Sequence, residues 1–226
     1  MRPAAPLWGL LACLAALPHP ARTADRPFAR VRVFQAACSH ARPGDVRSAL
    51  ARASELLERR CGVGLSLTAW TTLKVASPWC HLPADPRECR LAVAGMARAA
   101  KAADPGALAF FLLPSSAEER FSWALVDVSA RRGCGSPRDG RFLDRFGSAF
   151  FTDLAWEVGR DEGPSPGAQA AILVAHEVLH CLTQRGHPTR APRGAVMADS
   201  LADMGDQVDA DWCACALQSP YLTRTP

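Results

Sequence analysis

Apolar and polar positions change their period several times along the first half of the chain. Residues Arg30 to Gln35 alternate in the manner of a half-buried strand. A break at Pro43-Gly44 follows, with Asp45 as a candidate helix cap, and apolar residues then recur at helical spacing until Cys61-Gly62. The rest of this half is predicted to form strands over 63–75, 107–113 and 121–128, a helix over about 86–103, and loops over 77–89 and 131–140.

The second half is dominated by one strongly apolar helix. Before it, the pattern over 142–156 is ambiguous, and Ser148 to Thr152 is predicted to be a short edge strand. The helix itself is expected to have Ser165 as its N-cap, Pro166 at its first position and Gly186 as its stop. These signals give it a length of roughly twenty residues.

A final helix is expected near 209–218, with Asp206 or Asp209 at its start. The whole order is then strand, helix, strand, helix, strands and helix. Such an order predicts the α/β (α+β) class, with a mixed sheet and helices packed against it.

The strong helix carries the motif His176-Glu177-Val178-Leu179-His180 directly after an apolar run. Residues four apart lie on one face of a helix, about one turn apart, so the two imidazoles could bind one Zn²⁺. Glu177 would lie beside the metal, where its carboxylate could take a proton from a water molecule. A Lewis-acid metal, a carboxylate base and a water molecule are the components of a peptide hydrolase.

A catalytic zinc site needs a third protein ligand, and His187 is the leading candidate because it comes directly after Gly186. A thermolysin-like site would use a later Glu, and the sequence has none after Glu177. An Asp ligand is the remaining alternative. The Asp residues that follow are more easily explained as helix caps or solvated side chains, and they are Asp199, Asp203, Asp206, Asp209 and Asp211.

With His187 and the later segment Ala195-Val196-Met197-Ala198, the motif resembles that of the metzincin metallopeptidases. The resemblance is close over the motif helix and this segment, and loose over the upstream order of elements. It implies a zincin fold of two lobes and Zn²⁺ as cofactor. It also implies His176, His180 and His187 as ligands, Glu177 as general base and Met197 in the Met turn below the metal.

The sequence departs from the metzincin pattern at three points. Thr183 stands at the position of the family's Gly, and His187 follows His180 by seven residues where the family has six. A helix that runs slightly further, with Gly186 in the turn, would accommodate the extra residue. The Tyr that some members have after the Met turn is missing, because the only Tyr is Tyr221.

The amino-acid composition of the chain excludes some classes of function. The chain has 226 residues, of which 49% are hydrophobic, and this is typical of one globular domain or of two lobes around a cleft. Its formal net charge of +4 is too small to indicate a nucleic-acid-binding surface. No uncharged apolar stretch after the N-terminal segment is long enough for a transmembrane helix.

The first residues have the pattern of a secretory signal peptide. Arg2 supplies the positive charge, the run from Leu7 to Leu17 is apolar, and cleavage is expected near Ala21 or Ala24. Leu10-Leu11-Ala12-Cys13 also resembles a lipobox, so a lipid anchor on Cys13 is the less favoured alternative. Few residues separate Ala24 from the first predicted strand, and we therefore expect no long inhibitory pro-segment.

The cysteine count agrees with export. Beyond Cys13 the chain has eight cysteines, an even number that suggests disulfides in an oxidising compartment. Cys80 and Cys89 flank a short loop and could pair, whereas Cys213 and Cys215 are expected to have separate partners. Cys181 is a better candidate for a disulfide than for a zinc ligand.

These observations favour an exported zinc endopeptidase that acts on a peptide or protein substrate. Residues 1–24 would be its signal peptide and 25–226 its peptidase domain, with an N-terminal lobe to about 186, a C-terminal lobe from about 187 and the substrate between them. The alternative is a disulfide-rich exported binding domain with a zincin fold and little activity. The His spacing and the missing Tyr favour that alternative, and the intact Glu177 opposes it.

Overall fold

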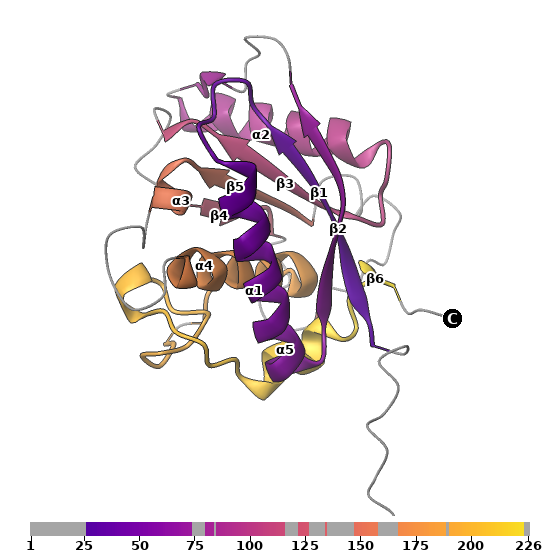
Figure 1. Cartoon of the computed structure of the whole chain (residues 1–226), viewed down its shortest axis with the longest axis vertical. Coiled ribbons are helices and arrows are strands. Elements are labelled where there is room, and N and C mark those ends of the chain that lie inside the picture. The colour runs from indigo at the N-terminus through magenta and orange to yellow at the C-terminus, as the bar shows by residue number, and fades with distance from the viewer. Residues whose placement is uncertain are drawn as a thin grey trace, which may run out of the picture.

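The computed structural model describes residues 26–73, 80–83, 85–115, 122–126, 134, 147–157, 167–188 and 190–223. These residues form one sheet with helices on both faces (Figure 1). The predicted signal peptide and the lipobox at Cys13 lie outside the described residues. The predicted start of the strongly apolar helix at Ser165 and Pro166 is wrong, because this helix begins at Ala168 with Gly167 as its N-cap. No helix among the described residues is long and apolar enough to cross a membrane.

The sheet is mixed and has six strands in the order β2-β1-β3-β5-β4, with β6 beside the start of β1. The pairs β1–β2, β1–β3 and β3–β5 are parallel, whereas β4 and β6 are antiparallel to their neighbours. The strands are β1 (Phe28–Gln35), β2 (Gly64–Thr72), β3 (Leu108–Leu113), β4 (Ser122–Ala124), β5 (Ser148–Thr152) and β6 (Leu222–Thr223).

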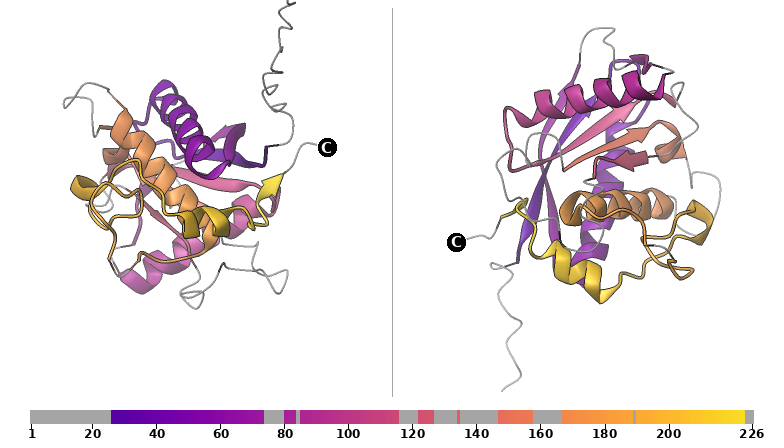
Figure 2. Two further views of the ribbon diagram at one scale, coloured as in Figure 1. Left: turned by 90° about the horizontal axis from the view of Figure 1, so that it is seen from below. Right: turned by 180° about the vertical axis from the view of Figure 1, so that it is seen from behind.

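Helices cover the two faces of this sheet in different numbers. Helix α2 packs on one face, and α1, α4 and α5 lie on the other, as the view from behind in Figure 2 shows. The α-helices are α1 (Pro43–Cys61), α2 (Pro86–Lys101), α3 (Leu154–Glu157), α4 (Ala168–Thr183) and α5 (Ala210–Ala216). A short 3-10 helix, Leu201–Asp203, precedes α5. The predicted fold class, a mixed sheet with packed helices, is therefore confirmed.

The two cores explain why β3 is an unbroken apolar run. Leu108, Phe110 and Leu112 enter the larger core under α1 and α4, whereas the residues between them enter the smaller core under α2. A strand that is buried on both faces has no polar positions to alternate with. All six residues of β3 are accordingly buried.

A row of stacked aromatic rings runs across the sheet and includes a residue of the edge strand β4. Phe34, Phe111, Phe150 and Trp123 come from β1, β3, β5 and β4, and their successive ring centroids lie 5.4, 4.7 and 5.2 Å apart. Offset-stacked rings add to the free energy of apolar burial. The short strand β4 is thus held firmly at the edge, where it borders the candidate site.

Two strand predictions are corrected. Ser148–Thr152 is β5, which lies between β3 and β4 and is buried throughout, so it is an inner strand and not an edge strand. The strand at this edge is β4, which spans Ser122–Ala124; residues 121, 127 and 128 of the predicted strand 121–128 lie outside the described residues. The inner position of β5 follows from its pairing with β3 on one side and β4 on the other.

Two helix boundaries are also corrected. Asp45 does not cap α1, which starts at Pro43 after Arg42, and Asp45 lies in the first turn. Helix α4 ends at Thr183 rather than at Gly186, because Gln184 adopts the left-handed conformation at φ 56°. The Gln184 backbone N–H donates to the His180 carbonyl at 2.8 Å, and its side-chain Nε2 donates to the Cys181 carbonyl at 2.7 Å. These bonds satisfy the open carbonyls of the helix end and replace the glycine.

Three disulfides join cysteines of the described residues: Cys38–Cys80, Cys61–Cys213 and Cys134–Cys215. Cys213 and Cys215 have separate partners, as predicted. The predicted Cys80–Cys89 pair is wrong, because Cys80 pairs with Cys38. The prediction of a disulfide at Cys181 is also wrong, since this residue is a fully buried thiol on the face of α4 that packs into the larger core. Such bridges are typical of proteins from oxidising compartments.

Candidate metal centre

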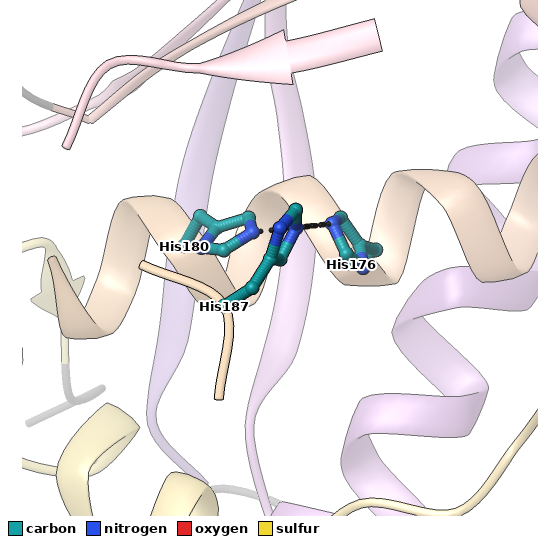
Figure 3. A group of neighbouring side chains, drawn as sticks. All are labelled: His176, His180 and His187. Carbon is teal, nitrogen blue, oxygen red and sulfur yellow. Dashed lines mark hydrogen bonds between the residues drawn. The ribbon is translucent and has the colours of Figure 1, made fainter. Parts of the chain in front are cut away.

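Three histidine side chains converge at the C-terminal end of α4. His176 and His180 lie one turn apart on the helix, and the chain folds back after Gln184 to bring His187 to the same place (Figure 3). The Nε2 atom of His176 lies 2.9 Å from that of His187 and 3.1 Å from that of His180. The residues that sequence analysis proposed as ligands are thus brought together, despite the unusual spacing of the third.

The opposite nitrogen of each ring faces an oxygen. His176 Nδ1 lies 2.7 Å from the Val196 carbonyl, and His180 Nδ1 lies 2.6 Å from the Arg185 carbonyl. His187 Nδ1 lies 3.0 Å from a carboxylate oxygen of Asp199. Carbonyl and carboxylate oxygens accept hydrogen bonds, so each Nδ1 carries the proton and donates. In the neutral rings each Nε2 then has a lone pair.

Three lone pairs that point at one another repel unless a cation lies between them. Burial lowers the pKa of His176 to about 4, and burial together with the neighbouring His176 lowers the pKa of His180 to about 3. Both rings are therefore neutral at pH 7, which is the form that binds metal. An outer oxygen acceptor that fixes each ring is the usual support of a histidine ligand. The donor set fits a divalent metal that prefers imidazole, such as Zn²⁺.

Glu177 lies beside this group and is buried in α4. Its Oε1 accepts a hydrogen bond of 2.6 Å from the Ser122 hydroxyl on β4, whereas its Oε2 has no hydrogen-bond partner among the described residues. Burial raises the pKa of Glu177 to about 8, although the bond from Ser122 opposes this rise. A bound cation would lower the pKa again by favouring the carboxylate. An unpartnered buried oxygen of this kind is suited to accept a proton from an incoming water molecule.

A cavity of about 560 Å³ opens over the histidines and Glu177. The edge strand β4 forms one side of it, and the segment after the Met197 turn contributes to another side. Its lining away from the histidines is mainly apolar and includes Trp123, Ala124, Val126, Leu173, Leu201 and Met204. The space is large enough for several atoms of a chain substrate.

The other sequence candidates take different places. Met197 is buried in a turn in which the Ala198 N–H donates to the Ala195 carbonyl at 3.3 Å, next to the Val196 carbonyl that holds His176. Asp199 lies behind the His187 ring and holds its Nδ1, so this carboxylate is no member of the converging group. Asp209 accepts a bond from Asp211 N–H and caps α5, as one of the two predicted caps.

Sequence reasoning missed Ser122 and the supporting role of Asp199. Ser122 is a polar residue within a predicted strand, where nothing in the sequence marks it as part of a site. It lies 55 positions before Glu177 in the chain. Only the pairing of β4 at the edge of the sheet places its hydroxyl over α4. His40 and His81 are exposed and lie outside the converging group.

The metal-free protein should be most stable near pH 6.5. The folded-state pKa values of His176 and His180 lie below the usual 6.5, so the unfolded chain binds more protons and the free energy of unfolding rises with pH up to that value. The folded-state pKa of Glu177 lies above the usual 4.5, so the free energy of unfolding falls as pH rises toward about 8. Below pH 6.5 the two histidines outweigh the one carboxyl. Above pH 6.5 the carboxyl lowers the free energy of unfolding, until near pH 8 the buried Lys101, whose pKa is lowered to about 8, opposes this fall. Urea unfolding with a chelator present measures this profile. Glu177→Gln should remove the fall above pH 6.5, and its persistence in that variant would refute the assignment.

Among solved structures, the fold is similar to that of metalloproteinase-II from Bacteroides fragilis, with a TM-score of 0.53 and 13% sequence identity. The match covers 88% of this chain and 55% of that one, so the chain spans about half the length of this relative. A chaperone–substrate complex also matches, with a TM-score of 0.49, 11% identity and coverage of 87% and 34%. No family model and no curated protein matches the chain. The chain therefore shares a metalloproteinase-like fold, and its three histidines form a group that could hold a metal ion.

Proposed function

We propose that the protein is an exported zinc-dependent endopeptidase of the metzincin type. The observation that carries this proposal is the convergence of three histidine Nε2 atoms in one cavity beside Glu177, whose Oε2 has no hydrogen-bond partner among the described residues. His176, His180 and His187 would hold Zn²⁺, and the turn at Met197 would support the first of them. A bound Zn²⁺ supplies Lewis acidity, which makes water more acidic and a carbonyl more electrophilic.

The residues of the chain have distinct tasks in this reaction. Glu177 takes the proton from the attacking water on Oε2 and later passes it to the leaving amine. Ser122 restrains Oε1, which leaves the other oxygen to act as the base. Strand β4 is an edge strand of the sheet that the described residues form and borders the cavity, so its backbone could pair with an extended peptide. An extended peptide or protein segment is therefore the proposed substrate.

The place of His187 weakens the alternative of an inactive binding domain. The extra residue between His180 and His187 was one reason for that alternative. Because α4 ends early, at Thr183, the longer connection still brings the Nε2 atom of His187 to 2.9 Å from that of His176. Export would follow from a signal peptide over 1–24, and the disulfides agree with an oxidising destination.

The proposal is tested by assaying the oxidised protein on a mixture of unstructured peptides. Cleavage should appear with Zn²⁺, disappear with a chelator and return when Zn²⁺ is restored. Cleavage that survives the chelator, or an absence of cleavage in protein shown to contain one Zn²⁺ per chain, would contradict the proposed activity.

Removal of the Ser122 hydroxyl should slow hydrolysis. Ser122→Ala takes away the hydrogen bond that orients Glu177, and a bond to a charged group of this kind corresponds to about a 10-fold loss in kcat. Affinity for Zn²⁺ and KM should change little, because Ser122 contacts no histidine of the centre through a hydrogen bond. Ser122→Thr keeps a hydroxyl and should restore most of the rate. A Thr variant as slow as the Ala variant would speak against the hydrogen bond as the cause.

A further inference from the structure

Helix α5 has seven residues and is fastened to the rest of the chain by two disulfides. Cys213 is bonded to Cys61, the last residue of α1, and Cys215 is bonded to Cys134. A helix of this length is not stable on its own and depends on its attachments. The disulfides therefore add to the apolar packing that holds α5 against its neighbours α4 and α1.

Trp212, the residue just before Cys213, packs directly on the metal centre. Its side chain is almost completely buried, and its ring meets the His180 ring edge to face, with centroids 6.0 Å apart at an interplanar angle of 81°. This contact is separate from the hydrogen bond that holds His180 Nδ1 at the Arg185 carbonyl. Edge-to-face contacts of this kind stabilise ring orientation.

The same helix contacts the side chain of Arg185, the residue whose carbonyl orients His180. The Arg185 guanidinium lies 5.7 Å from the Trp212 ring centroid and 3.8 Å from the Asp211 carboxylate. The Arg185 carbonyl accepts the 2.6 Å hydrogen bond from His180 Nδ1, and Arg185 lies on the short connection that leads to His187. Helix α5 thus supports His180 twice, through the Trp212 ring and through Arg185.

We propose that Trp212 is a positioning residue of the metal centre and that the disulfides of α5 make the affinity for metal depend on oxidation. In the reduced chain, Trp212 and Arg185 lose their fixed place and the three histidines are no longer held in their converging geometry. Oxidation is a thiol–disulfide exchange. A disulfide oxidant R–S–S–R takes two electrons from the Cys61 and Cys213 thiols, the Cys61–Cys213 bond forms, and two R–SH molecules leave. The chain would then bind metal most tightly in an oxidising compartment.

This proposal rests on the proposed metal centre but not on peptidase activity. Its readout is Zn²⁺ affinity, measured by competition with a chromophoric chelator on the oxidised protein. Cys61→Ala with Cys213→Ala should weaken Zn²⁺ binding by about 10- to 100-fold, the range seen when an outer partner of a metal ligand is removed. Substitution by Ala avoids free thiols that could bind Zn²⁺ themselves.

The matched control is the third disulfide. Cys38–Cys80 joins the β1–α1 connection to the segment before α2 and bonds to no residue of α5. Cys38→Ala with Cys80→Ala removes the same kind of bond and should change Zn²⁺ affinity by less than about 3-fold. Equal weakening in the two double variants would overturn the proposal, because it would show a general loss of stability.

A further variant keeps all disulfides and decides the matter if the Cys61 and Cys213 variant does not fold. Trp212→Leu keeps an apolar side chain but removes the aromatic ring, which contacts the His180 ring and the Arg185 guanidinium. This variant should weaken Zn²⁺ binding by about 10-fold. Unchanged Zn²⁺ affinity in Trp212→Leu overturns the proposal while leaving the metal centre intact. A wild-type protein that binds no Zn²⁺ overturns both, and a wild-type protein that binds Zn²⁺ without cleaving peptides overturns only the proposed activity.

Discussion

Replacement of Glu177 by Gln should abolish peptide hydrolysis while leaving the fold and the metal in place. The amide has the shape of the carboxylate but cannot take a proton from water on the oxygen that faces the cavity. Loss of a general base costs about 10²–10⁴-fold in rate. The comparison is made at equal Zn²⁺ content, with peptide cleavage as the measurement.

Glu157→Gln is the matched control for this variant, because it makes the same chemical change at an exposed position of α3. It should cleave at the wild-type rate. Normal turnover in a zinc-loaded Glu177→Gln protein would remove Glu177 from the mechanism. A loss of Zn²⁺ from that protein would instead show that the carboxylate helps to hold the metal.

Replacement of His187 by Ala should weaken Zn²⁺ binding more than about 100-fold, beyond the effect of any outer partner. The variant removes one of three converging Nε2 atoms and leaves only the pair on α4. A pair of ligands does not complete a zinc site, which needs at least three protein ligands. Equilibrium dialysis or chelator competition measures the change.

Two Asp variants test whether the third zinc ligand is His187 or an Asp. Asp199→Ala removes the acceptor behind His187 and should weaken Zn²⁺ binding by about 10-fold, less than the loss of the ligand itself. Asp203→Ala should have no effect, since Asp203 bonds to Ser200 and Arg193 away from the histidines. Retention of Zn²⁺ by His187→Ala together with its loss from Asp199→Ala would reverse the assignment of the third ligand.

The sequence was sufficient for those parts of the fold that depend on local pattern. Helical spacing located α1, and the HExxH spacing placed His176, Glu177 and His180 together on α4 because these residues are neighbours on the helix. The start of the final helix was also predictable from local sequence, since Asp209, one of its two predicted caps, is the N-cap of α5. Signals of this kind need no knowledge of the rest of the chain.

Features that depend on distant contacts could not be predicted in the same way. The inner position of β5 follows from the strand order of the sheet, which its five residues do not encode. The end of α4 at Gln184 depends on a side chain that replaces a glycine, an exception to the usual preference. Ser122 and Trp212 reach the centre from β4 and α5, and no motif links either of them to the histidines.

The central claim is that His176, His180 and His187 hold one metal ion beside Glu177. The most direct test is a crystal of the oxidised protein grown with Zn²⁺, with anomalous diffraction data collected at the zinc absorption edge. We predict a single strong peak at about 2.0–2.1 Å from the Nε2 atoms of all three histidines, within the cavity that Glu177 lines. A crystal without a peak at this position, or with a peak that is bound by Asp199 in place of His187, would contradict the account.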